Sequence, residues 1–172
     1  MKKIILKLIL LITFTIPIFS HQEVFVYSKN KFSINGNKNF SMYGKKYIVL
    51  DLNNGLGRFF AFNANGSLYL YGRITGGTPD TRDRTPEGIF SVIQKQKYHM
   101  STLYPADDGN NNMNDMLKIT NSGVALHKGS LNYYSHGCIH IDPKKSRQLF
   151  NWADYNTKVV ITNDFFVDTL RK

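Results

Sequence analysis

Residues 47–71 read YIVLDLNNGLGRFFAFNANGSLYLY, and this stretch decides the fold. It holds three runs of apolar, aromatic and β-branched residues, separated by Asn53-Asn54-Gly55 and by Asn63-Ala64-Asn65-Gly66. Asn-Gly sequences supply the positive φ angles that tight hairpin turns need. The pattern therefore predicts a three-stranded antiparallel meander.

Downstream of this meander, more short runs of the same kind predict strands at 89–93, 117–120, 124–126 and 158–162. A long Asn-rich loop at 98–114 separates two of them, and loops of this length often carry binding function. One helix is predicted to start at Pro143 with Asp142 as its N-cap, and its apolar side comprises Leu149, Phe150 and Trp152. The chain is thus predicted to be a single, mainly β domain with one or two short helices.

The first twenty residues are typical of a secretory signal peptide. Lys2 and Lys3 precede an apolar run that only Lys7 interrupts, and the segment 8–19 is short for a membrane span. We expect export to the periplasm or cell envelope, with membrane contact only through an uncleaved segment. Cleavage would lower the formal net charge from +10 to +7, because three lysines and no acid are lost. The remaining charges are scattered, so no nucleic-acid partner is predicted.

Residues 21–44 are polar and rich in Asn and Lys, and we expect a lead-in with weak strands, one of them at 23–27.

The only cysteine, Cys138, stands in Ser135-His136-Gly137-Cys138-Ile139-His140, shortly after His127. In an exported chain a single cysteine is an inert buried thiol, an intermolecular disulfide partner or a reactive group. A catalytic thiol needs a base and donors for an oxyanion. His127 is a candidate base, and Gly137 allows a tight turn that presents backbone amides. If His127 activates the thiol, alkylation should proceed well below the ordinary thiol pKa of about 8.5.

Zinc binding is the alternative chemistry for this cluster, because imidazole and thiolate are common zinc ligands. The candidate ligands are His127, His136, Cys138 and His140. However, three of them alternate along one short segment and leave poor room for tetrahedral closure. No metal site is predicted.

Ser135-His136-Gly137-Cys138 with an upstream histidine resembles the L,D-transpeptidase (YkuD) catalytic domain. Thr85-Pro86-Glu87-Gly88-Ile89-Phe90 is similar to the start of a strand in that family, and Gly123-Val124-Ala125-Leu126-His127 is similar to the strand that carries its histidine. The resemblance covers residues 45–163 and leaves 164–172 as a C-terminal tail. It implies a mixed β-sandwich.

The resemblance also implies an activity. A family member transfers the acyl group of the diaminopimelate residue in a peptidoglycan tetrapeptide stem to its cysteine, releases D-alanine, and passes the acyl group to an amine without a cofactor. Peptidoglycan stem peptides are therefore the expected partners. An L,D-carboxypeptidase, which uses water as the acceptor, and a non-catalytic wall-binding module are the alternatives.

Carried over to this chain, the resemblance makes Cys138 the nucleophile, His127 its general base and Lys128 the residue whose backbone carbonyl orients the imidazole. Gly137 would supply an oxyanion amide, and His136 would shape the site. The implied substrate-binding residues are Ser135, which also holds the turn, His140, Tyr98, Tyr104 and Tyr134. The tyrosines equally suit ordinary packing over the core. The family usually has arginine at position 140, and a histidine does not offer the bidentate carboxylate grip of an arginine.

Overall fold

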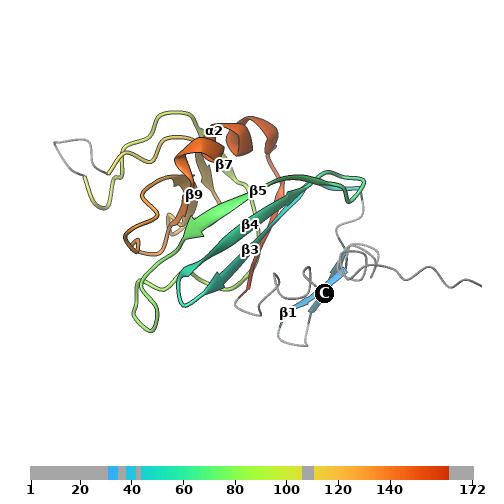
Figure 1. The fold of residues 1–172 in the computed structure, drawn as a ribbon, viewed down its shortest axis with the longest axis horizontal. Helices are drawn as coiled ribbons and strands as arrows, with labels where there is room; N and C mark the ends of the chain where they lie inside the picture. Colours follow the sequence, from blue (N-terminus) through green and yellow to red (C-terminus); the bar gives the residue numbers. More distant parts are fainter. Residues whose placement is uncertain (1–30, 35–37, 42–43, 106–110, 163–172) are drawn as a thin grey trace, which may run out of the picture.

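The computed structural model describes residues 31–34, 38–41, 44–105 and 111–162 (Figure 1). An antiparallel pair, β1 (Lys31–Ile34) and β2 (Lys38–Ser41), lies within the predicted lead-in. The predicted signal segment, the predicted strand at 23–27 and the predicted tail at 164–172 fall outside the described residues. All later strands belong to one nine-stranded sheet.

The predicted meander is confirmed. It consists of β3 (Tyr47–Asn53), β4 (Leu56–Phe62) and β5 (Leu68–Thr75), each antiparallel to its neighbour. In the turn between β3 and β4, Asn54 and Gly55 have φ angles of 48° and 74°. Two consecutive positive φ angles are what an Asn-Gly hairpin turn requires. The sequence of this turn therefore sets the register of the first hairpin.

The remaining strands extend the sheet on both sides of the meander, in the order β6-β11-β3-β4-β5-β10-β9-β8-β7. They are β6 (Gly88–Ser91), β7 (Gln94–Gln96), β8 (Met116–Lys118), β9 (Ala125–Lys128), β10 (Ile139–Ile141) and β11 (Lys158–Thr162). The pairs β11–β3 and β9–β10 are parallel and the others are antiparallel, so the sheet is mixed.

One large apolar cluster joins the two halves of this sheet. Ile48, Phe59 and Val159 on one half belong to the same buried cluster as Leu126 and Ile139 on the other. The sheet therefore curls around its core, with β3 to β5 in front of β7 and β9 in Figure 1. Each large side chain buried there contributes about 1.5–3 kcal/mol. The curl places the outer surfaces of β9 and β10 beside the loops that form the site.

The predicted helix is also confirmed as α2 (Pro143–Trp152), the one helix among the described residues. An Asp142 carboxylate oxygen accepts a hydrogen bond from the Lys144 N–H at 2.9 Å, which caps the first turn. Leu149 and Trp152 are buried on its inner side. Because α2 follows directly on β10, it anchors the end of the strand that carries the cysteine motif. No helix in the described parts of the chain is both long and apolar enough to cross a membrane.

Candidate active site

A groove of about 520 Å³ lies above β8, β9 and β10. One wall comes from the loop after β7 and the other from residues 129–136. Most of the side chains expected at the site line this groove; they are Cys138, His127, His136, His140, Ser135, Tyr104 and Tyr134. Tyr98 does not line it. Tyr98 is 70% exposed, and the cationic groups of Lys97 and Arg147 lie 5.2 and 5.8 Å from the centroid of its ring.

Parallel pairing of β9 with β10 brings two histidines together. His127 and His140 are direct partners in the register of these strands. Their neighbours Leu126 and Ile139 point into the core, so alternation places both imidazoles on the outer face. The two rings meet edge to face, with centroids 5.1 Å apart and planes at 73°.

The His127 imidazole is held as a neutral base. Its Nδ1 lies 2.9 Å from the Lys128 carbonyl oxygen, which only accepts hydrogen bonds, so Nδ1 carries the proton and Nε2 keeps its lone pair. Burial, and after it the neighbouring His140, lower the pKa of His127 to about 4. The side chain is only 7% exposed. At neutral pH this ring is therefore uncharged and able to accept a proton.

The Cys138 thiol is also neutral at rest. Its Sγ donates to the Gly123 carbonyl oxygen at 3.7 Å. Burial raises the pKa of the thiol, and a backbone hydrogen bond with Ala125 only partly opposes this. Among the described residues the hydrogen bonds of Sγ go to backbone groups and none goes to His127. The expected activation of the free thiol well below its ordinary pKa is therefore not supported by this resting geometry.

The turn before Cys138 is held by Ser135. Its Oγ donates to the Cys138 carbonyl oxygen and accepts the Gly137 N–H at 3.1 Å. Gly137 has a φ of +106°, which favours glycine at this position. The Gly137 N–H was expected to donate to the oxyanion of the intermediate. Here it is hydrogen-bonded within the turn instead, and Gly137 does not line the groove. Ser135 is 7% exposed, and its hydroxyl is engaged in holding this turn.

Thr85 is a residue whose role at the site sequence reasoning missed. Its buried hydroxyl accepts the Gly77 N–H at 2.8 Å and donates to the Gly137 carbonyl oxygen at 3.1 Å. A further bond at 2.9 Å joins the Ser135 N–H to the Gly76 carbonyl oxygen. The loop after β5 therefore clamps the cysteine turn. The signal in the sequence for this close packing was the pair Gly76-Gly77. A Cβ on Gly77 would lie 1.7 Å from the Asp83 carbonyl oxygen, so only glycine fits there.

The groove walls depend on two imidazole contacts. His136 is exposed and stacks on Tyr104, with ring centroids 4.2 Å apart. The Nδ1 of His140 lies 2.8 Å from the Ser130 carbonyl oxygen. A Cβ on Gly129 would lie 2.5 Å from the His140 ring, so the loop can pack on this imidazole only because residue 129 is glycine. His140 thus contacts the wall formed by residues 129–136, and His136 contacts Tyr104 in the wall formed by the loop after β7.

The zinc alternative finds no support in this geometry. Within residues 44–105 and 111–162 and the two short N-terminal strands, no three His, Cys, Asp or Glu side chains are grouped so that they could hold a metal ion.

Comparison with known proteins agrees with this geometry. The family model of the L,D-transpeptidase catalytic domain (YkuD) matches residues 45–161, so the resemblance found in the sequence is confirmed. No curated protein matches the chain in sequence.

Solved structures share the fold. An L,D-transpeptidase from Stackebrandtia nassauensis is 19% identical, with a TM-score of 0.57 over 69% of this chain and 55% of that one. One from Mycobacterium smegmatis is 19% identical, with a TM-score of 0.56 over 77% and 65%. A cysteine-to-serine variant of the Enterococcus faecium L,D-transpeptidase is 22% identical, with a TM-score of 0.56 over 73% and 55%. This chain thus spans less than two thirds of each of these proteins.

Proposed function

The chain belongs to the L,D-transpeptidase catalytic domain family, and on that premise we propose that it is an exported cysteine acyltransferase acting on peptidoglycan stem peptides. The observation that carries the proposal is that one groove is lined by both Cys138 and a neutral, oriented His127. Cleavage of the first twenty residues and delivery to the periplasm or cell envelope are part of the proposal, and the basic, apolar start of the sequence supports them.

Acylation of Cys138 starts from a neutral thiol and a neutral imidazole. When a tetrapeptide stem enters the groove, Sγ turns from the Gly123 carbonyl and passes its proton to Nε2 of His127. The sulfur attacks the acyl carbon between diaminopimelate and D-alanine and forms a tetrahedral intermediate. The imidazolium then gives its proton to the departing D-alanine amine, and a thioester remains.

Transfer of the acyl group reverses these roles. An amine of a second stem attacks the thioester, His127 takes a proton from that amine, and the thiol leaves with the proton returned. The Lys128 carbonyl keeps Nδ1 protonated in both half-reactions, so Nε2 is always the reacting nitrogen. The ring therefore needs no rearrangement between the steps.

The oxyanion donors follow from the turn geometry. Because the Gly137 N–H is hydrogen-bonded to Ser135 Oγ, we assign the first oxyanion contact to the amide of Cys138 itself. The Gly137 amide contributes only if substrate binding releases that bond. Ser135 and Thr85 hold the turn in place through hydrogen bonds to its backbone.

His140 is proposed to have a different role from the arginine that the family usually has at this position. Burial lowers the pKa of His140, so the ring is neutral, and its Nδ1 is committed to the Ser130 carbonyl. A neutral ring in this state supports the loop rather than gripping a substrate carboxylate. Tyr104 and Tyr134, which line the groove, are proposed to contact the stem peptide.

The test is D-alanine release from purified tetrapeptide muropeptides. The wild-type protein should release D-alanine, and Cys138→Ala should release none. His136→Gln, on the groove wall away from proton transfer, serves as a comparison variant whose activity should fall less than that of His127→Gln. Release of D-alanine by Cys138→Ala at the wild-type rate would refute the mechanism. Wall binding without release by the wild-type protein would point to a non-catalytic module, and release without a cross-linked product would point to the carboxypeptidase.

A further inference from the structure

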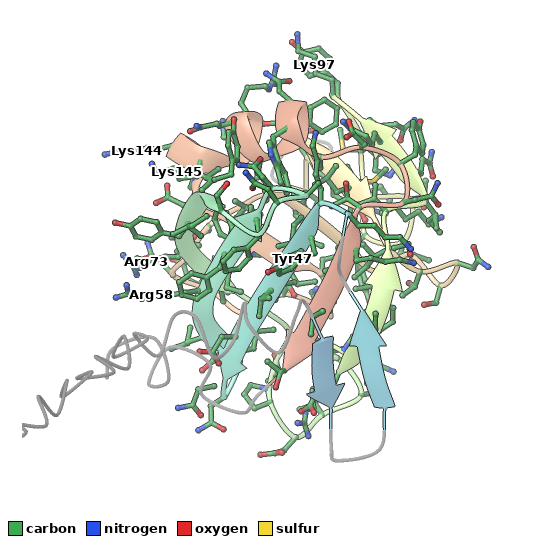
Figure 2. The ribbon with its side chains drawn as sticks, turned by 90° about the vertical axis from the view of Figure 1, so that its right-hand side faces the viewer. Tyr47, Arg58, Arg73, Lys97, Lys144 and Lys145 are labelled. Carbon is green, nitrogen blue, oxygen red and sulfur yellow. The ribbon has the colours of Figure 1, made fainter. Side chains whose placement is uncertain are left out.

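Two arginines face each other on the outer surface of the meander. Arg58 on β4 and Arg73 on β5 are direct cross-strand partners, and both side chains are exposed. Their neighbours Phe59 and Ile74 belong to the core, which places the guanidinium groups on the opposite face. Figure 2 shows Arg58 and Arg73 projecting from the same side of the molecule as Lys144 and Lys145 of α2.

This pair is unfavourable for the fold on its own. Like charges directly opposite each other on a sheet are destabilising. Among the described residues, neither guanidinium forms an ion pair. Two acids share this cross-strand row. Asp51, opposite Arg58, is only 5% exposed. Asp142 lies beside Arg73, to whose carbonyl oxygen its N–H donates, and its carboxylate is engaged in capping α2. The two guanidinium groups are therefore the most exposed charges of the row, and an external anion would relieve their repulsion.

The arginine pair lies next to the groove along the same sheet surface. Thr75, two residues after Arg73, pairs with His140 of the groove. Two residues along a strand span about 7 Å, so the arginine row lies one pleat beyond the row of His127 and His140. The loop at 129–134 packs on the histidine row, where Thr75 donates a 3.2 Å hydrogen bond to the Leu131 carbonyl oxygen. A polymer that leaves the groove over this loop would meet the arginines.

We propose that Arg58 and Arg73 form an extended subsite that binds carboxylates of the peptidoglycan polymer outside the groove. The inference rests on the proposed function, because it takes its ligand from the polymer whose stem occupies the groove. Exposed Tyr71, next along β5 on the same face, adds an aromatic surface that suits a sugar ring. The protein would thus hold the wall at two places, and a soluble stem peptide would engage only one of them.

The test compares charge reversal on this face with matched charge reversal elsewhere. Arg58→Glu with Arg73→Glu is the test variant, and Arg82→Glu with Lys97→Glu is the control with the same change in net charge. Sedimentation with purified peptidoglycan sacculi measures binding. The test variant should bind about tenfold more weakly, and the control should match the wild type. Added salt should weaken wild-type binding more than that of the test variant. Thermal unfolding checks that both variants fold.

Equal weakening in both variants would overturn the subsite, because it would show an effect of net charge alone. Unchanged binding by the test variant would overturn it as well. Vesicles containing phosphatidylglycerol form a third arm. If charge reversal abolishes vesicle binding and leaves sacculus binding intact, the surface serves a membrane and the proposal is wrong. D-alanine release by the wild-type protein, measured separately on a soluble tetrapeptide, tests the proposed function without involving this surface.

Discussion

Burial of a neutral His127 makes the folded protein sensitive to acid. The unfolded chain binds a proton at this histidine near its ordinary pKa of 6.5, whereas the folded protein does so only near a pKa of about 4. Between these values the unfolded state holds more protons, so stability falls as the pH falls. The full contribution is present above pH 6.5 and is lost progressively down to about pH 4.

The size of the effect follows from the two values. Each pKa unit between the folded and unfolded states corresponds to about 1.36 kcal/mol, so His127 accounts for about 3 kcal/mol in total. About 2.5 kcal/mol of this is lost between about pH 7 and pH 4.5. His127→Gln keeps a donor for the Lys128 carbonyl but cannot titrate. The variant should therefore lose about 2.5 kcal/mol less than the wild type over the same interval.

Urea denaturation at both pH values, followed by circular dichroism, measures this difference. Other carboxyl and imidazole groups, including His140, contribute to both proteins, so comparison of the two losses isolates His127. His136→Gln is the matched control, because His136 is exposed on the groove wall, and it should behave as the wild type. If the wild type and His127→Gln lose the same stability on acidification, the inference that His127 is a buried, neutral imidazole is wrong.

Three other outcomes follow from the same contacts. Thr85→Val leaves the Gly77 N–H and the Gly137 carbonyl unsatisfied, so the free energy of unfolding should fall by about 2–3 kcal/mol and D-alanine release should fall with it, whereas Thr85→Ser should restore most of both; equal behaviour of the two variants would count against the clamp. Gly77→Ala should cost about 2–3 kcal/mol in chemical denaturation, because its Cβ would overlap the Asp83 carbonyl, and an unchanged midpoint would contradict this. Because burial raises the pKa of the Cys138 thiol, its alkylation rate by iodoacetamide should keep rising above about pH 8.5, and a plateau already at neutral pH would show a preformed thiolate.

The fold was predictable where local chemistry specifies it. The Asn54-Gly55 turn and the Asp142-Pro143 helix start each depend on residues adjacent in sequence, and both form as expected. Two strands were missed. β7 is Gln94-Lys95-Gln96, which has no apolar face, and β10 is only three residues long within the cysteine motif. Both become strands because longer neighbours offer them a partner, which no local pattern reveals.

The site was predictable in its residues but not in its contacts. The motif identified Cys138 and His127, and the parallel register that pairs His127 with His140 comes only from the assembled sheet. The Thr85 clamp joins residues 52 positions apart in the chain. Tyr98 was expected at the groove because its segment resembles the family's cap over the substrate channel, yet its ring lies outside the groove beside the cationic groups of Lys97 and Arg147. The charge states of the thiol and the imidazole depend on burial, which sequence does not give.

Intact-protein mass spectrometry after mixing with a tetrapeptide muropeptide tests the central claim most directly. We predict a covalent adduct whose mass equals that of the muropeptide minus D-alanine, located on Cys138 after digestion and absent from Cys138→Ala. Wild-type protein that releases D-alanine without this thioester, or an adduct that persists in Cys138→Ala, would contradict it.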